Sequence, residues 1–533
     1  MKQKRLSLPL LLVAVVMGGL VYGAPRLHAQ VPEAPFTLVG HIETFTLDTP
    51  TDIFSSAKMT VNGIQVVIPR NTIVVLPAAY FTPQQLFRGP TQGPVLAQSG
   101  LALNDPSPPP VAFEATLIGN IINGTTYIAG LVYISQQSLN TSGGYIRKID
   151  YTTGEMCVGL SPTPATTCVA PDTRVRINDP LGRYGLADGP AKTSPDLRFT
   201  VDPDNPTIHA GTGYPMCVPR VAPPTVDPQC SITNRPKDAG GHFLTTWVMS
   251  GPDIVPPITG LPTIVSCDTL RQTCDPTQQA PFVVGDYIDF AGTFTEDGTP
   301  THPDYVSAHT INASVGIYTK QGVGNTVYIS QETTFLGTGP INCSAAAECQ
   351  AKIRMVGFTT DPSRVTSNLV NVYAIDVDRN GVRRTRNLLL GQSKKEGFFG
   401  RFRFDVAKNT GLTPDGKGAT RELLVSIDDN GPMPDGTLVP DKLNASSRLK
   451  ANGLMAGQYV APNFDYLFPE TTLPGASLPP ANLKCLAFLT AGWGIQNLET
   501  PSDTTLLNIP QLAPWPGATV PPASPAGITC STF

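Results

Sequence analysis

The chain has 533 residues and a formal net charge of −4, and only 15% of its residues are charged, against roughly 25% in an average protein. Glycine and proline are frequent (49 and 54 residues), but the hydrophobic content of 41% is enough for packed cores, which argues against a disordered chain. The mildly acidic balance argues against nucleic acid and anionic lipid as partners.

Residues 1–29 have the pattern of an export signal. The basic start, Lys2 to Arg5, is followed by an apolar stretch over residues 6–23, and cleavage is expected just before Gln30. Removing this segment, which holds four basic residues and no acid, changes the net charge from −4 to −8. The alternative is a membrane anchor, which needs about 20 clean apolar residues and is disfavoured by Pro9. We expect a secreted chain without a transmembrane segment after cleavage.

Strand patterns dominate residues 34–200, which we predict to form a first β-barrel-like domain. Alternating apolar runs flank Asn62-Gly63 and Asn123-Gly124, the dipeptides that favour two-residue hairpin turns. A proline-dense segment with two cysteines follows, and residues 201–239 are predicted to be a disulfide-bearing connector between domains.

A second barrel, of the five-stranded OB type, is predicted over residues 240–340. Val284-Gly285-Asp286 leads directly into a strand, a pattern common in such barrels. Tyr127–Gly130 and Asp289–Gly292 also resemble each other and are each followed by a strand, which indicates a repeated unit. The alternative is that this similarity only reflects features that strands share.

Residues 351–463 contain four further strand patterns and are predicted to form a third, β-sandwich-like domain. The proline-rich segment 464–533 is expected to pack on the body through a disulfide. The predicted fold class is therefore all-β and multi-domain, with two OB-like barrels, a sandwich-like unit and disulfide-stapled loops.

The ten cysteines predict a disulfide framework, since their number is even and the expected compartment is oxidising. About 945 pairings are possible by counting. Neighbours in sequence are the expected partners: Cys157 with Cys168, Cys217 with Cys230, Cys267 with Cys274, Cys343 with Cys349, and Cys485 with Cys530. Cys-x-x-Cys is missing, and no histidine lies at zinc-finger spacing, so zinc and haem are not expected.

One segment matches the first half of a calcium loop, with Asp376, Asp378 and Asn380 as ligands. No cofactor is expected, with calcium at this loop as the alternative. The twelfth position of the loop should be acidic but is Asn387, and three arginines crowd the segment. The favoured alternative is a hairpin turn at Asn380-Gly381.

No assembled catalytic motif is visible. None of the histidines after the leader lies in His-Glu-x-x-His, and no Gly-x-Ser-x-Gly or phosphate-binding glycine loop occurs. A glycosidase needs only two carboxylates brought together by the fold, so a secreted hydrolase stays the least favoured of three hypotheses. We expect no enzymatic activity.

Exposed aromatic rings on one barrel face would favour a carbohydrate-binding or other ligand-binding protein. Tyr287, Phe290 and Tyr318 are the candidates for such a face. The favoured alternative places all three in the core.

The segment from Arg198 to His209, continuing through Cys217 to Arg220, resembles a block in a family of secreted, largely uncharacterised β-rich proteins of bacteria and fungi. The resemblance covers most of the chain after the leader and implies an exported β-domain protein. In overall character the chain is also similar to surface-layer proteins, although its ten cysteines are many and no cell-wall-anchoring repeat is visible.

These observations together predict a non-catalytic structural protein of the cell surface that assembles with itself through strand edges or apolar patches. The alternatives are a secreted protein that binds carbohydrate or another ligand, with cell-surface glycans as partners, and the hydrolase.

Overall fold

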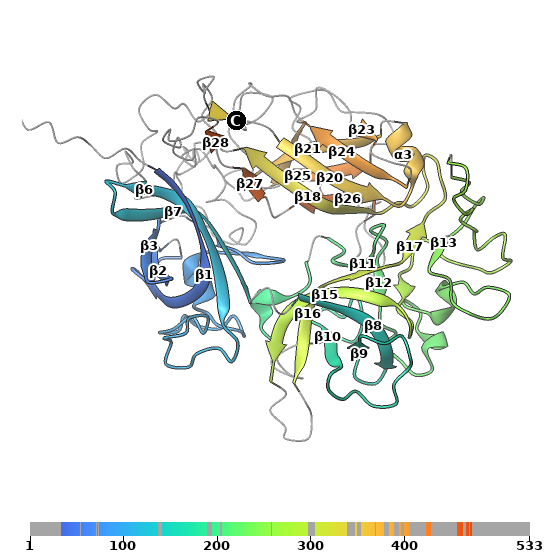
Figure 1. The fold of residues 1–533 in the computed structure, drawn as a ribbon, viewed down its shortest axis with the longest axis horizontal. Helices are drawn as coiled ribbons and strands as arrows, with labels where there is room; N and C mark the ends of the chain where they lie inside the picture. The colour runs from blue at the N-terminus through green and yellow to red at the C-terminus, as the bar shows by residue number, and fades with distance from the viewer. Residues whose placement is uncertain are drawn as a thin grey trace, which may run out of the picture.

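The computed structural model describes residues 34–471, apart from residues 54, 71, 73, 137–140, 189–194, 203–204, 257, 297–303, 338–346, 349–352, 368, 378–382, 388–393, 396–398, 406–422, 428–455, 462–464 and 468–469. The fold is all-β and multi-domain, as predicted, with two closed five-stranded barrels and further sheets (Figure 1). In the described ranges the α-helices are two short ones, α2 (Pro83–Leu86) and α3 (Pro362–Thr366). No helix in this part of the chain is long and apolar enough to cross a membrane.

Barrel 1 is built from five strands near the start of the described chain. They are β1 (Ala34–Leu47), β2 (Ala57–Val61), β3 (Ile64–Ile68), β6 (Phe113–Ile122) and β7 (Thr126–Gln136). The parallel pairing of β3 with β7 closes the ring. The two predicted hairpin turns are confirmed: Asn62-Gly63 and Asn123-Gly124 all have positive φ and join β2 to β3 and β6 to β7.

Barrel 2 repeats this arrangement. Its strands are β8 (Thr141–Asp150), β9 (Glu155–Gly159), β10 (Thr173–Ile177), β15 (Tyr287–Thr295) and β16 (Tyr305–Ala313). The parallel pairing of β10 with β16 closes it. In both barrels the ring runs first, second, third, fifth and fourth strand in chain order, and the long insertion separates the third strand from the fourth.

A glycine marks the same bulge in each barrel. Pairing of the fourth strand shifts register at Gly119 in β6 and at Gly292 in β15. A Cβ atom would lie 1.9 Å from the carbonyl oxygen of Ile128 at the first position and 2.3 Å from that of Ser307 at the second. Only glycine fits so close an approach of two backbones. The two barrels therefore do repeat one strand arrangement, but the predicted alignment is wrong, because Gly292 corresponds to Gly119 and not to Gly130.

The strand pairings revise the predicted boundaries. The predicted domain 34–200 contains all of barrel 1, but from Thr141 onward its strands belong to barrel 2. The predicted connector 201–239 is part of the insertion between β10 and β15, so it lies within the second unit instead of joining two units. The sequence pattern predicts β8 as a strand but not β9 or β10, and it does not say which strands β8 pairs with, which caused the error in the boundary.

Short elements fill the insertions. Barrel 1 carries β4 (Val74–Val75), β5 (Tyr80–Phe81) and α2. The insertion of barrel 2 carries three turns of 3₁₀-helix and four short strands, and β17 (Gly316–Tyr318) follows β16 and pairs with β13. The elements of that insertion are η2 (Leu197–Phe199), β11 (Ile208–Ala210), β12 (Met216–Cys217), η3 (Pro224–Val226), η4 (Ile232–Asn234), β13 (Thr246–Val248) and β14 (Ala280–Pro281).

The third unit consists of a five-stranded and a four-stranded sheet that overlap in Figure 1. The larger has the order β23 (Lys394–Lys395), β24 (Arg401–Asp405), β20 (Ile353–Thr359), β18 (Ile329–Gly337), β27 (Asp465–Leu467). The smaller has the order β22 (Arg383–Asn387), β21 (Val370–Val377), β25 (Leu423–Ile427), β26 (Gln458–Ala461). A separate pair joins β19 (Ala347–Glu348) to β28 (Glu470–Thr471). The unit begins before the predicted boundary at residue 351, since β18 is one of its central strands.

Candidate functional site

The segment that carries the sequence resemblance lies where barrel 1 meets the insertion of barrel 2. Arg198 is buried, and its Nη1 donates to the carbonyl oxygens of Leu86 and Ser99, both at 2.8 Å. Its Nη2 lies 2.6 Å from Oδ2 of Asp196. The next residue, Phe199, stacks on Phe113 of β6 with ring centroids 5.1 Å apart and belongs to the core of barrel 1. The guanidinium group of Arg198 and the ring of Phe199 thus attach the insertion of barrel 2 to barrel 1.

The same segment is attached to barrel 2. The side-chain amide of Asn178, just after β10, donates to the carbonyl oxygens of Asp196 and Phe199 at 3.1 and 3.0 Å. Further along, Oγ1 of Thr207 donates to the carbonyl oxygen of His309 in β16 at 2.9 Å. These bonds pair backbone carbonyl groups that are buried between the segment and barrel 2, where an unpaired carbonyl group would destabilise the fold.

Asn205 connects the segment to the third unit. Its side-chain amide donates to the carbonyl oxygen of Val460 in β26, and its Oδ1 accepts from the Val460 N–H at 2.7 Å. Asp202 holds Asn205 in place through two further bonds, at 3.1 Å from the backbone N–H and 2.9 Å from the side chain. Residues 196–209, called the junction segment below, therefore contact all three units.

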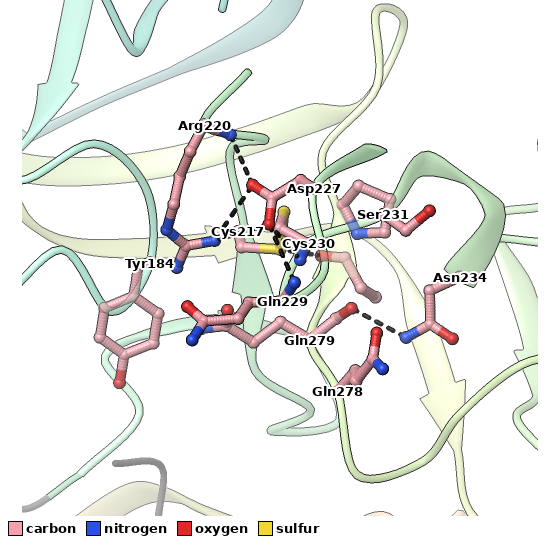
Figure 2. Close-up of a disulfide and its surroundings, with 12 residues drawn as sticks. Tyr184, Cys217, Arg220, Asp227, Gln229, Cys230, Ser231, Asn234, Gln278 and Gln279 are labelled. Carbon is pink, nitrogen blue, oxygen red and sulfur yellow. Dashed lines mark hydrogen bonds and ion pairs between the residues drawn. A yellow bond between two sulfur atoms is a disulfide. The ribbon is translucent and has the colours of Figure 1, made fainter. Parts of the chain in front are cut away.

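The connector disulfide Cys217–Cys230 is buried and supported by an aspartate (Figure 2). Asp227 accepts from the backbone N–H groups of Arg220, Gln229 and Cys230 at 2.7 to 3.0 Å, and Arg220 pairs with it at 3.2 Å. Burial alone would raise the pKa of Asp227, but these donors outweigh it and lower the pKa. The carboxylate thus holds together the two ends of the loop that the disulfide closes.

Asp286, in the predicted Val-Gly-Asp motif, also has a structural role. Its two oxygens pair with Nη1 and Nη2 of Arg235 at 2.5 and 2.6 Å, and both side chains are buried. The Arg235 guanidinium lies 5.3 Å from the ring centre of Trp247. This pair attaches the insertion to the start of β15, because Asp286 also accepts from the N–H of Val283.

Three of the five predicted disulfides are confirmed: Cys157–Cys168, Cys217–Cys230 and Cys267–Cys274. Cys343, Cys349, Cys485 and Cys530 lie outside the described residues, so the other two pairings stay predictions. Disulfides of this kind are compatible with an extracellular protein.

The predicted calcium ligands are not brought together in the described residues. The backbone of Asp376 lies within β21, opposite Arg384 of β22, whereas Asp378 and Asn380 lie outside the described residues. The antiparallel pair continues to Val377 opposite Arg383, as the hairpin alternative requires. Among the residues that the structure describes, no group of three or more His, Cys, Asp or Glu is placed to hold a metal ion.

Of the three predicted ligand-face aromatics, two are core residues. Phe290 and Tyr318 are buried, as the alternative interpretation expected. Tyr287 is 37% exposed and packs edge-on against Tyr145, with ring centroids 5.2 Å apart. No continuous aromatic face follows from these positions.

An exposed apolar hairpin, which the sequence prediction missed, lies between β13 and β14. Residues 254–267 carry no charge, and paired backbone bonds between Ile254 and Ile264 at 3.0 and 2.9 Å form its base. Val255, Ile258 and Leu261 are 73%, 42% and 43% exposed. We call residues 254–264 the apolar hairpin.

The base of the apolar hairpin is clamped by polar and covalent contacts. Asp253 accepts from the N–H of Ser266 at 2.8 Å, and Asp268 accepts from that of Gly251 at 2.7 Å. The side chain of Thr269 and the N–H of Ser266 lower the pKa of Asp253. The Cys267–Cys274 disulfide follows directly. The exposed apolar side chains are thus presented on a fixed base.

Comparison of the chain with protein-family models, with curated proteins and with solved structures finds no match. The resemblance to a family of secreted β-rich proteins therefore stays a prediction.

Proposed function

We propose that this chain is a non-catalytic, extracellular structural protein that assembles with copies of itself at the cell surface. The observation that carries the proposal is the apolar hairpin, which exposes three large apolar side chains on a base fixed by a disulfide and two aspartates. Contiguous exposed apolar patches mark interaction sites on soluble proteins, whereas apolar side chains scattered singly do not. The leader pattern and the three disulfides support an extracellular location.

The arrangement of the three units supports the same function. A building block of an ordered assembly must keep the relative positions of its contact surfaces. The junction segment joins the units through buried hydrogen bonds of Arg198 and Asn205 and through the stacked ring of Phe199. Several of the buried charges, such as Arg198, Arg235 and Asp286, pair with one another or with backbone groups and so stabilise structure.

In the two barrels, apolar contacts suit assembly better than strand edges do, whereas the two sheets of the third unit are open and keep edge strands. Each five-stranded ring is closed by a parallel pairing, β3 with β7 and β10 with β16, so its strands offer little free edge. Burying the exposed parts of Val255, Ile258 and Leu261 contributes about 1 kcal/mol for each side chain. Many weak, repeated contacts of this size suffice in a lattice.

Sedimentation velocity over a concentration series tests the proposal. The mature protein is compared with Val255→Asp/Leu261→Asp, which places two charges on the exposed tip of the hairpin. Leu181→Asp is the matched control, since Leu181 is 75% exposed and lies in the insertion away from the hairpin sequence. We expect concentration-dependent association of the mature protein and of the control, and monomers for the double variant. Monomers of the unmodified protein at all concentrations would contradict self-assembly.

A further inference from the structure

The open end of barrel 2 contains a hollow that the structural role does not use. β8, β10 and β16 begin at this end and β15 ends there. The hollow has a volume of about 370 Å³ and is partly open to solvent. Ligand sites of 300–1,000 Å³ are typical, and the mouths of β-barrels are a preferred place for them.

The floor of this hollow is apolar and partly aromatic. Phe290 and Phe294 come from β15 and Val306 from β16. Phe290 is only 2% exposed, whereas Phe294 is half-buried and offers part of its ring to the hollow. A flat apolar face of a ligand fits such a floor.

The rim is polar and rigid. Ser142, Thr173 and Asp304 bring hydroxyl and carboxylate groups to it. The Cys157–Cys168 disulfide crosses the same end, and Cys168 lines the hollow. A fixed rim reduces the entropy lost when a ligand binds.

Two of the three charged residues that line the hollow, Asp172 and Arg174, form ion pairs, and the third is Asp304 of the rim. Asp172 lies 2.5 Å from Nη1 of Arg147, and Arg174 forms two bonds with Glu155, at 2.8 and 2.6 Å. Each cation at the hollow is thus matched by a carboxylate. This pairing disfavours a strongly charged ligand and leaves hydrogen bonding and stacking as the means of recognition.

We propose that the open end of barrel 2 is a binding site for a neutral sugar ring of an oligosaccharide or polysaccharide. A pyranose has an apolar C–H face that stacks on Phe294 and hydroxyl groups that hydrogen-bond to the rim at Ser142, Thr173 and Asp304. Such a site would let the chain contact a neutral glycan. It does not depend on self-association, because the apolar hairpin contributes no residue to it.

Isothermal titration of the mature protein with neutral hexasaccharides of glucose, N-acetylglucosamine and mannose tests the site, with hexagalacturonate as the charged comparison. Phe294→Ala removes the stacking ring, and Ser142→Arg blocks the entrance from an exposed position, which keeps the test valid if Phe294→Ala does not fold. Tyr287→Ala is the matched control, because this exposed aromatic residue is on the same strand but does not line the hollow.

We expect at least one neutral hexasaccharide to bind, each of the two site variants to weaken it at least tenfold, and Tyr287→Ala to leave it unchanged. No binding of any neutral hexasaccharide, or binding of hexagalacturonate alone, would overturn the proposal. So would loss of binding in Tyr287→Ala with binding retained in Ser142→Arg, because the Tyr145–Tyr287 pair would then be the sugar platform.

Discussion

Replacing Arg198 with methionine should destabilise the whole molecule, because this buried side chain joins two units. The substitution leaves the carboxylate of Asp196 without its partner at 2.6 Å and the carbonyl oxygens of Leu86 and Ser99 without their donor. Removing one member of a buried pair costs about 3–5 kcal/mol. The matched control is Arg401→Met, since the Arg401–Glu332 pair is 36% and 43% exposed and such pairs contribute about 0–1 kcal/mol.

Urea unfolding, followed by tryptophan fluorescence and circular dichroism together, measures the effect. We expect the first transition of Arg198→Met to move to lower urea by a free-energy change several times that of Arg401→Met. The double variant Arg198→Met/Asp196→Leu should recover part of the loss, because it removes the unpaired carboxylate as well. Equal effects of the two single methionine variants would refute the assignment of a joining role to Arg198.

Two further predictions concern pH and a disulfide. Burial lowers the pKa of His309 to about 4, so the stability that it contributes is complete above its unfolded pKa near 6.5 and is lost as pH falls from there to 4. Between pH 6.5 and 4, the free energy of unfolding should fall by about 3 kcal/mol less in His309→Asn than in the unmodified protein, as measured by urea unfolding. An equal fall in both proteins would contradict a buried neutral imidazole. Cys267→Ser/Cys274→Ser should lower stability by about 2–3 kcal/mol in the loop-entropy model and expose the apolar hairpin to protease. Cys157→Ser/Cys168→Ser should leave protease cleavage of the apolar hairpin unchanged. Equal cleavage in the two double variants would show that the Cys267–Cys274 disulfide does not fix the base of the hairpin.

Local features of the fold could be predicted from the sequence where a residue type determines the backbone conformation. Asn62-Gly63 and Asn123-Gly124 have the positive φ values that their hairpin turns require. The three confirmed disulfides close loops between neighbouring cysteines, where proximity in sequence limits the alternatives. Apolar alternation predicts most of the long strands, such as β1, β7 and β8, but not short ones such as β11, β12 and β14.

Long-range pairing could not be predicted. Periodicity places β8 among strands but does not assign it to barrel 2, because its partner β15 is far away in sequence. The joining role of Arg198 was missed for the same reason, since its acceptors at Leu86 and Ser99 lie about a hundred residues earlier. The apolar hairpin could have been found: an uncharged run between Asp253 and Asp268, rich in proline and glycine, is typical of an exposed loop and unusual for its apolar content.

Negative-stain microscopy of the purified mature protein, with and without millimolar calcium, shows directly whether the chain assembles with itself. We expect regular sheets or filaments from the unmodified chain, and single particles from Val255→Asp/Leu261→Asp under the same conditions. Dependence of the order on calcium would make Asp376, Asp378 and Asn380 the first residues to substitute. Monodisperse single particles of the unmodified chain in both conditions would contradict self-assembly.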